Sequence, residues 1–349
     1  MREEDKGSMD KAMLAALFEG EGKLALREVP VPKVEKPDDV LLQVEGAGIC
    51  GTDVHILDVP PGHPATIGAI LGHEYVGKVM EIGDDVKGLK PGDRVVVAPN
   101  LYCGICHYCQ QGRPNQCQSF TTLGVYLNGG FAKYSVAPER ALFKISPGLA
   151  TDEAVFAELL SCVLGGTEKV RLQPGETVAI LGAGPVGLVF CLVFKAAGAG
   201  KIIVSDIAPF RLAMAKKIGA DVVVNPQKED LNGAVKAATG GGVDVVVDAV
   251  GTLLPEAVSL ADKGGKVVLF GMNQQAHPAV SQYSITRNEL TIYGTFIGIN
   301  TFPRAIKMLE SGAVKPSALI THRLPLSRLV EGLEALRQGL AIKVVLTPE

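Results

Sequence analysis

Four cysteines stand close together in the segment 103–117, and their spacing is that of a metal site. They follow the pattern C-x2-C-x2-C-x7-C, at Cys103, Cys106, Cys109 and Cys117. Thiolates are soft ligands, and four of them on one short segment can close a tetrahedron around Zn²⁺ with no open position. The spacing therefore predicts a structural zinc site in a lobe that spans residues 99–117.

Two other motifs overlap these cysteines. The first two cysteines, followed by His107, match the c-type haem attachment motif, and the second and third match a thioredoxin-like pair. A haem would leave the last two cysteines without a role. A redox pair is expected at the end of a strand that leads into a helix, whereas Pro99 and Pro114 flank this segment. The spacing thus favours zinc over both alternatives.

A glycine motif further along the chain predicts a dinucleotide site. Gly182, Gly184 and Gly187 form the pattern G-x-G-x-x-G between an apolar, strand-like run and a helical segment. Glycines permit a tight turn and let the backbone approach a pyrophosphate, whose charge is favoured at a helix N-terminus. Pro185 suits the first helical turn, and Val186 lies between it and the last glycine. All five are candidate cofactor-binding residues.

The acid after the next predicted strand bears on the choice of cofactor. Asp206 stands about where a carboxylate accepts hydrogen bonds from the adenosine ribose hydroxyls. A 2′-phosphate would face this carboxylate, so Asp206 predicts NAD and makes NADP the less favoured cofactor. Arg211 lies close enough in the sequence to weaken that preference. It is either a further cofactor contact or a solvated helix residue.

A third group of residues carries a resemblance to a known family. Cys50, Thr52, Asp53 and His55 are followed by His73 within a Gly-His-Glu tripeptide. Together with the cysteine lobe and the glycine motif, over nearly the whole chain, these residues resemble the zinc-containing medium-chain dehydrogenase/reductase family of alcohol and polyol dehydrogenases. The resemblance implies an α/β protein in which a Rossmann doubly wound parallel sheet accompanies a β-rich, GroES-like catalytic domain.

The resemblance also implies roles for these residues. Cys50 and His73 would ligate a catalytic zinc, Asp53 would orient His73, and Thr52 and His55 would pass the substrate proton outward. Without the resemblance, Cys50 would more often be a buried core residue and His73 a turn histidine. A catalytic zinc needs an open coordination position for the substrate.

The third protein ligand of this zinc is left open by the sequence. Glu74 adjoins His73, and Glu158 begins a stretch similar to the Glu-Pro-Leu-Ser of polyol-oxidising members of the family, although Leu159 departs from the proline. Cys162 lies one helical turn beyond Glu158, and simple alcohol dehydrogenases use cysteine there. A carboxylate in an apolar stretch is costly to bury without a partner, which favours Glu158.

One lysine near the C-terminus is a further candidate. Lys343 opens a predicted strand at residues 343–346. It resembles the family position where a cation meets the cofactor pyrophosphate. A solvated lysine at the start of a strand is an equally weighted alternative.

The elements that must position these residues change in kind near residue 150. Before it, short strands at 40–44, 75–79, 94–97 and 132–136 are separated by Gly and Pro, which predicts a β-rich domain. After it, apolar runs alternate with helical segments, as in a parallel sheet buried on both faces. These runs lie at 178–181, 201–205, 222–224, 243–248, 266–270 and 290–293.

The predicted organisation has three stretches. Residues 9–158 form the catalytic zinc-binding domain, residues 159–298 form the NAD-binding domain, and residues 299–349 return to the catalytic domain. Helices are expected at 302–310 and 324–338. The first residues, Met1–Met9, are charged and lack the apolar run of a secretory signal, so they are left out of the fold.

Composition argues against several kinds of partner. With 47% hydrophobic residues and a formal net charge of −3, the chain has no basic excess that would recommend nucleic acid. The apolar run 178–194 is interrupted by glycines and falls short of the ~20 residues that span a membrane. Seven cysteines without an export signal predict thiols and metal ligands in the cytoplasm, where disulfides are disfavoured.

The leading prediction is a zinc- and NAD-dependent dehydrogenase, with two zinc ions per chain, that oxidises a secondary alcohol. A polyol or sugar alcohol is the favoured substrate. Ile56 follows His55 where several polyol enzymes of the family have tyrosine, so 2,3-butanediol and L-threonine are alternatives. A non-catalytic NAD-binding redox module is less favoured, because it would not need a complete relay. The family resemblance suggests a dimer or tetramer.

Overall fold

The computed structural model describes residues 11–349. Residues Met1–Met9, which the prediction left out of the fold, lie outside the described residues. The described chain divides into two compact units. Unit 1 comprises residues 11–111, Gln116–Glu158 and Thr321–Glu349, and unit 2 comprises Gly112–Asn115 and Leu159–Ile320.

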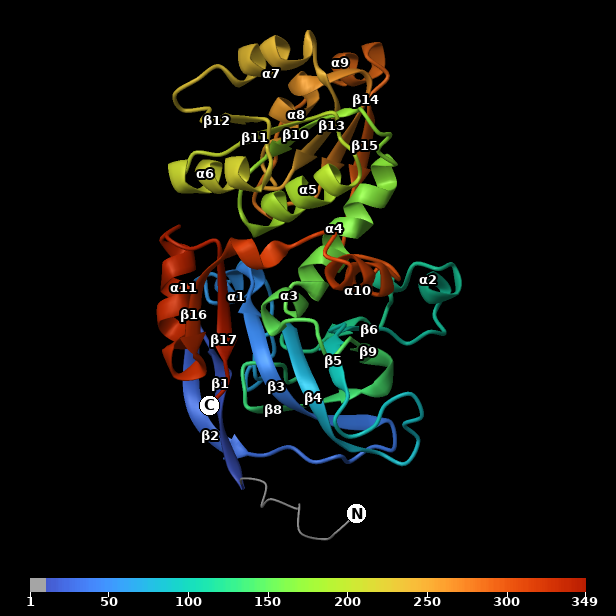
Figure 1. The fold of residues 1–349 in the computed structure, drawn as a ribbon, viewed down its shortest axis with the longest axis vertical. Coiled ribbons are helices and arrows are strands. Elements are labelled where there is room, and N and C mark those ends of the chain that lie inside the picture. The colour runs from blue at the N-terminus through green and yellow to red at the C-terminus, as the bar shows by residue number, and fades with distance from the viewer. Residues whose placement is uncertain (1–10) are drawn as a thin grey trace. The chain divides into compact units, whose positions relative to one another are not determined.

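Unit 1 is built on an antiparallel sheet (Figure 1). In its described residues the strand order is β16-β17-β3-β4-β5-β9, and β8 also pairs with β3, while β1–β2 and β6–β7 form separate pairs. Its strands are β1 (Ala12–Gly20), β2 (Lys23–Pro30), β3 (Asp39–Ile49), β4 (Glu74–Ile82), β5 (Arg94–Val97), β6 (Asn100–Leu101), β7 (Thr121–Thr122), β8 (Tyr134–Pro138), β9 (Leu142–Lys144), β16 (Ile320–Pro325) and β17 (Lys343–Thr347). Its helices are α1 (Gly51–Ile56), α2 (His107–Gln110), α3 (Thr151–Ala154) and α11 (Leu329–Arg337).

Strand β3 is the central element for the site. It is buried over nearly its whole length, which explains why consecutive positions such as Val40, Leu41 and Leu42 are all apolar. It pairs with β4 through Gly48 and Glu74, and with β17 on its other side. The C-terminal end of β3 and the first residues of β4 and β17 therefore meet at one edge of the sheet.

Unit 2 is a doubly wound sheet. In its described residues six parallel strands lie in the order β12-β11-β10-β13-β14-β15, with α5 and α6 on one face and α7 and α8 on the other (Figure 1). Its strands are β10 (Thr177–Leu181), β11 (Lys201–Ser205), β12 (Val222–Val224), β13 (Val243–Asp248), β14 (Ala261–Leu269) and β15 (Thr291–Gly294). Its helices are α4 (Ala157–Val170), which crosses the unit boundary, α5 (Pro185–Ala196), α6 (Pro209–Ile218), α7 (Leu231–Thr239), α8 (Leu254–Leu260), α9 (Gln282–Arg287) and α10 (Phe302–Glu310).

The strand order of unit 2 places the glycine motif at a switch point. The chain leaves β10 toward β11 on one side, and it later returns to β13 on the other side of β10. Ligands of such sheets bind beyond the carboxyl end of the strands where the order reverses. The turn after Leu181 is that position.

The C-terminal part of the chain differs from the prediction. Residues 299–320 belong to unit 2, and the chain returns to unit 1 at Thr321. A buried hydrogen bond of 2.8 Å joins the hydroxyls of Ser161 and Thr301, and the 3₁₀ helix Pro316–Leu319 packs against α5. These contacts are between segments far apart in the sequence, so the pattern of the tail did not reveal them.

Two element boundaries also differ. The helix expected at 324–338 begins at Leu329, because Leu324 and Pro325 belong to strand β16. The apolar run 178–194 is divided between β10 and α5.

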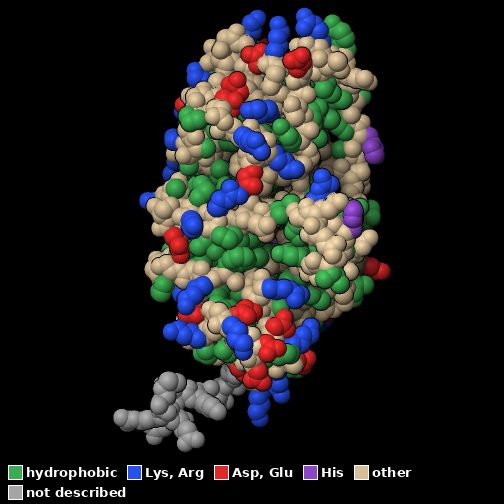
Figure 2. Space-filling model, turned by 90° about the vertical axis from the view of Figure 1, so that its right-hand side faces the viewer, with side chains coloured by type: hydrophobic (Ala, Val, Ile, Leu, Met, Phe, Trp, Pro, Cys, Tyr) green, Lys and Arg blue, Asp and Glu red, His purple; other side chains and the backbone are tan. Residues whose placement is uncertain are grey.

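Among residues 11–349, no helix is long and apolar enough to cross a membrane. Figure 2 shows one face of the molecule, on which hydrophobic side chains are interspersed with charged side chains of both signs.

Candidate functional site

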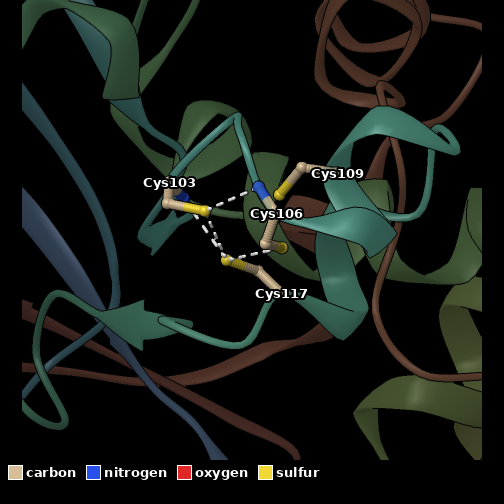
Figure 3. Close-up of side chains that lie close together, drawn as sticks. All are labelled: Cys103, Cys106, Cys109 and Cys117. Carbon is tan, nitrogen blue, oxygen red and sulfur yellow. Dashed lines mark hydrogen bonds between the residues drawn. The ribbon is translucent and has the colours of Figure 1, made fainter.

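The four lobe cysteines come together in unit 1, and their sulfur atoms point toward one another (Figure 3). All four sulfurs lie within 4.8 Å of one another, and the Sγ of Cys117 is 3.5 Å from that of Cys103 and 3.9 Å from that of Cys106. Zn–S bonds of about 2.3 Å in a tetrahedron place sulfurs about 3.8 Å apart, whereas a disulfide needs about 2.05 Å. The arrangement therefore fits a tetrathiolate zinc site.

The charges of the lobe also fit a cation. Backbone N–H groups of Cys109 and Gln118 lower the pKa of Cys106 to about 6, which favours its thiolate. Desolvation and the neighbouring Cys106 side chain raise the pKa of Cys109 to about 12. The N–H of Ser119 donates to the sulfur of Cys117 at 3.3 Å. Four thiolates at these separations repel one another, and a divalent cation relieves that repulsion.

A second cluster of possible ligands consists of Cys50, His73 and Glu74. Their ligand atoms also lie within 4.8 Å of one another. Cys50 stands between β3 and α1, and His73 immediately precedes β4, which begins at Glu74. The pairing of Gly48 with Glu74 across β3 and β4 brings these segments together. The cluster is thus a product of sheet register.

The carboxylate of Asp53 contacts both Cys50 and His73. It is fully buried, and its Oδ2 accepts a hydrogen bond of 2.8 Å from the N–H of Cys50. Its Oδ1 lies 3.6 Å from Nδ1 of His73. A carboxylate behind one ring nitrogen orients a metal-ligating histidine and leaves Nε2 for the metal. The position of Asp53 agrees with the role that the family resemblance implied.

The donor set of this cluster fits zinc. Asp53 Oδ1, His73 Nδ1 and Glu74 Oε1 are buried and have no hydrogen-bond partner among the described residues. Burial and the nearby Glu74 raise the pKa of the Cys50 thiol. Burial would lower the pKa of His73, but the negative charges of Cys50 and Asp53 outweigh it and raise that pKa. A thiolate, an imidazole and a carboxylate are ligands of catalytic zinc sites.

Lys343 forms an ion pair with Glu74 inside unit 1. Its Nζ donates to Oε2 of Glu74 and, at 3.2 Å, to the carbonyl of Ile49, and both charged side chains are 1% exposed. Burial would raise the pKa of Glu74, but Lys343 lowers it, so the carboxylate is ionised. The prediction of a solvated lysine is therefore wrong, and a contact of Lys343 with the pyrophosphate stays a prediction. Sequence analysis missed the pair because 269 positions separate its members.

The other two candidates for the third ligand, Glu158 and Cys162, lie on α4. Both side chains are buried. Burial would lower the pKa of Lys343, but the negative charges of Glu74 and Cys50 and, to a smaller extent, of Glu158 raise it. Of the three candidates for the third ligand, Glu74 is the one that clusters with Cys50 and His73 in the described part of unit 1. A metal-ligating role for Glu158 stays a prediction.

The two relay residues lie on α1. The Thr52 hydroxyl is 3.7 Å from the sulfur of Cys50, and His55 lies one turn further, with a side chain that is 59% exposed. Nδ1 of His55 is 3.1 Å from Oδ2 of Asp58, a partner that the sequence did not predict. Helix α1 thus leads from the metal cluster to solvent.

The glycine motif occupies the turn between β10 and α5. Gly182 has a φ of +98°, which favours glycine. A Cβ at Gly187 would lie 1.8 Å from the carbonyl oxygen of Gly182, so no side chain fits there. Gly184 precedes α5, which begins with Pro185 and has no side-chain cap at its N-terminus. The first N–H groups of the helix, including that of Val186, therefore remain available to an anion.

Asp206 makes contacts that sequence analysis did not foresee. Its Oδ2 accepts from the N–H of Ala183 in the glycine turn, and its Oδ1 accepts from the N–H of Ala208, both at 2.7 Å. It thereby ties the end of β11 to the glycine turn, and hydrogen bonding to a ribose stays a prediction. Arg211 lies over the ring of Phe210, and its buried Nε has no hydrogen-bond partner within residues 11–349.

Asp248 is a second acid at this edge that was not among the predicted site residues. It ends β13 and is 2% exposed. Its oxygens accept from the N–H groups of Val250, Gly251 and Leu253 at 2.8 to 2.9 Å, which fixes the turn after the strand. An aspartate at the end of an apolar run and shortly before a glycine was the available signal.

Both halves of the chain match known protein families. The family described as "Alcohol dehydrogenase GroES-like domain" matches residues 36–147, and the family described as "Zinc-binding dehydrogenase" matches residues 185–311. The first match falls mainly on unit 1 and the second on unit 2.

Proteins of known name are similar to this chain over nearly its whole length. Sorbitol dehydrogenase of Bacillus subtilis (strain 168) is 34% identical over 352 residues, which cover 96% of this chain and 97% of that protein. L-threonine 3-dehydrogenase of Bacillus licheniformis is 33% identical over 353 residues, which cover 97% of this chain and 100% of that protein. The names of these two proteins give different substrates.

Solved structures are similar to the same extent. A zinc-binding dehydrogenase from Sinorhizobium meliloti 1021, bound to NADP, has a TM-score of 0.92 at 34% identity, with 97% of this chain and 100% of that chain covered. An alcohol dehydrogenase from Escherichia coli CFT073, complexed with NADH, has a TM-score of 0.90 at 32% identity and the same coverage. The two structures contain different cofactors.

Proposed function

This chain belongs to the zinc-containing medium-chain family of alcohol and polyol dehydrogenases, and on that premise we propose that it oxidises a secondary alcohol to a ketone with NAD. The observation that carries the proposal is the cluster of Cys50 with the buried His73 and Glu74, at the start of the helix that bears Thr52 and His55. A structural metal ion has no need of a hydroxyl and a histidine beside it, whereas alcohol oxidation needs a path by which a proton can leave.

The chain's own residues would share the work as follows. When bound, zinc supplies a Lewis acid that lowers the pKa of an alcohol hydroxyl, and NAD supplies the hydride acceptor. Cys50 and His73 would hold the metal, and Asp53 would keep the His73 ring in place. Thr52 would accept the hydrogen bond of the substrate hydroxyl, and His55 would release its proton to solvent. The alcohol thus loses one proton and one hydride, which gives the ketone and NADH.

The proposed substrate is a polyol or sugar alcohol. The name of the Bacillus subtilis relative supports this class, as does the stretch that begins at Glu158. L-threonine and 2,3-butanediol are the second candidates, since Ile56 replaces the tyrosine of several polyol enzymes and one relative is named a threonine dehydrogenase. A panel of these alcohols decides between the candidates.

The proposed cofactor is NAD. Asp206 supports it, because a buried carboxylate at the end of β11 would repel a 2′-phosphate. The similar structures hold NADP in one case and NADH in the other, so they do not decide the choice. Family membership further supports two zinc ions per chain, a homodimer or homotetramer, and a cytoplasmic location as parts of the proposal.

The test is a nicotinamide absorbance assay of the zinc-loaded protein with a panel of polyols, diols and L-threonine, each with NAD and with NADP. We expect turnover of at least one polyol or diol, faster with NAD. A matched Cys50→Ser variant should lose this activity, while Cys191→Ser, which changes a buried cysteine of α5 in unit 2, should keep it. Cofactor binding without turnover of any alcohol would instead support a non-catalytic NAD-binding module.

A further inference from the structure

The loop that follows α1 folds back on the relay histidine. The N–H of Gly62 donates to the carbonyl of His55 at 2.9 Å, and a Cβ at Gly62 would lie 3.6 Å from Nδ1 of His55. Further along, the N–H of Thr66 donates to the carbonyl of Val125 at 3.1 Å. The loop therefore spans from the relay to the turn that carries Tyr126, and His63 stands on it.

The ring of His63 has a defined hydrogen-bonding state. Its Nδ1 lies 2.8 Å from the carbonyl oxygen of Pro64, and because a carbonyl only accepts, Nδ1 carries the proton. Nε2 of the neutral ring is then an acceptor, and it has no hydrogen-bond partner among the described residues. The ring packs against Tyr126 with its centroid 6.4 Å away, at an angle of 36°.

The surroundings of His63 keep this ring neutral. Burial lowers its pKa below the ordinary value, while the Pro64 carbonyl opposes this effect. The ionisable groups that act on it are His73 and His55, which lower the pKa, and Asp53, which raises it. One of these groups, His73, belongs to the metal cluster, Asp53 lies behind it, and His55 belongs to the relay. The hydrogen bond from Gly62 to the carbonyl of His55 places His63 next to the proposed relay, where Nε2 of its ring offers an acceptor.

We propose that Nε2 of His63 accepts a hydrogen bond from a second hydroxyl of the substrate and thereby selects diols and polyols over monohydric alcohols. The inference rests on the proposed function and assigns a specificity-determining residue to it. The second hydroxyl of a diol, which the metal does not bind, needs a hydrogen-bond acceptor. A monohydric alcohol has no second hydroxyl and would leave Nε2 of the half-buried His63 ring unpaired. A packing role against Tyr126 alone would not distinguish the two kinds of alcohol.

The test compares 2,3-butanediol with 2-butanol, which differ by one hydroxyl. Wild type should prefer the diol. His63→Phe keeps a ring against Tyr126 but has no acceptor, and it should lower kcat/KM for the diol about tenfold, the value of one neutral hydrogen bond, while kcat/KM for 2-butanol changes little. His63→Gln, whose Oε1 can accept, should retain most of the preference. His322→Phe makes the same change on β16 and serves as the matched control.

Three outcomes would overturn the assignment. Equal losses on both alcohols in His63→Phe would show a general effect on the relay or on folding, and an unchanged preference would show that Nε2 makes no such bond. A wild type that prefers 2-butanol would also contradict it. In all three cases the protein still oxidises alcohols, so the proposed function stands. Turnover of neither of these two alcohols, nor of any other alcohol in the panel, by zinc-loaded wild type would sink both proposals.

Discussion

The two clusters of possible metal ligands in unit 1 differ in the way the chain builds them. The lobe cluster comes from one segment of residues 103–117, and its sulfurs meet because the segment is short and irregular. The cluster of Cys50, His73 and Glu74 comes from the ends of two strands, and Glu74 is further held by Lys343 of a third strand. A closed, local site stabilises its own loop, whereas a site assembled from strand ends can keep a position open for substrate.

The largest expected effect tests the assembled cluster. Replacing Cys50 by Ser should lower kcat/KM by more than about a hundredfold. Removing a residue that only hydrogen-bonds to a metal ligand already costs about 10- to 100-fold, and removing the ligand itself should cost more. Zinc content, measured by elemental analysis, should fall from two ions per chain to one. A variant that retains both ions and full activity would contradict the assignment of Cys50.

A variant of the lobe should lose stability and keep its activity, the opposite of what is expected for Cys50→Ser. Cys117→Ser should lower the free energy of unfolding by several kcal/mol, because a closed zinc site contributes folding energy directly. The kcat of the fraction that stays folded should change by no more than about threefold. Chemical denaturation and active-site titration measure the two quantities. A lobe variant with normal stability but no activity would reverse the roles of the two clusters.

Three variants with smaller expected effects test which residue is the third ligand of the zinc bound by Cys50 and His73. If Glu158 enters the zinc coordination when substrate and cofactor bind, Glu158→Ala should lower kcat or zinc occupancy strongly, and Glu74→Ala should lower them less. Cys162→Ala should cost only packing, on the order of 1 kcal/mol of unfolding free energy. Loss of the catalytic zinc in the Cys162 variant, with the Glu158 variant unaffected, would overturn this ranking.

Asp93 belongs to neither cluster, and its ion pair shows how small a stability effect is expected without a metal. Its carboxylate accepts a hydrogen bond from Lys144 in a 2.8 Å ion pair, and this contact lowers its pKa. A lowered pKa means that the pair stabilises the fold above the unfolded pKa of the carboxyl and that this stability is lost as the pH falls through the folded pKa. Asp93→Asn should therefore cost up to about 1 kcal/mol at pH 7 and nothing at pH 2.

The measurement for this last prediction is urea denaturation across the acid range, with wild type and variant side by side. The two stability curves should converge as the pH falls below 4. A difference that stays constant with pH would mean that Asp93 acts through shape alone. The metal clusters should give far larger differences than this ion pair, because partly solvated charges are screened.

Much of the fold followed from local patterns. The apolar runs predicted for unit 2 coincide with β10 to β15 to within one residue at each end, except that β14 begins at Ala261, before its predicted start at 266. Strands buried on both faces need apolar residues at consecutive positions. The tail was less predictable. Residues 299–320 join unit 2 through contacts such as Ser161 with Thr301, and nothing in the segment's own pattern encodes a partner 140 residues away.

What the sequence determined by itself was chemistry held within short stretches: the tetrathiolate lobe, and the glycine turn between β10 and α5. Neighbours along the chain are also neighbours in space, so spacing alone fixes such geometry. The tertiary structure alone decided that Glu74 pairs with Lys343, that Asp206 ties the glycine turn to β11, and that the loop of His63 folds back on His55. These contacts depend on strand register and loop closure, which join residues whose separation in the sequence carries no information about their distance.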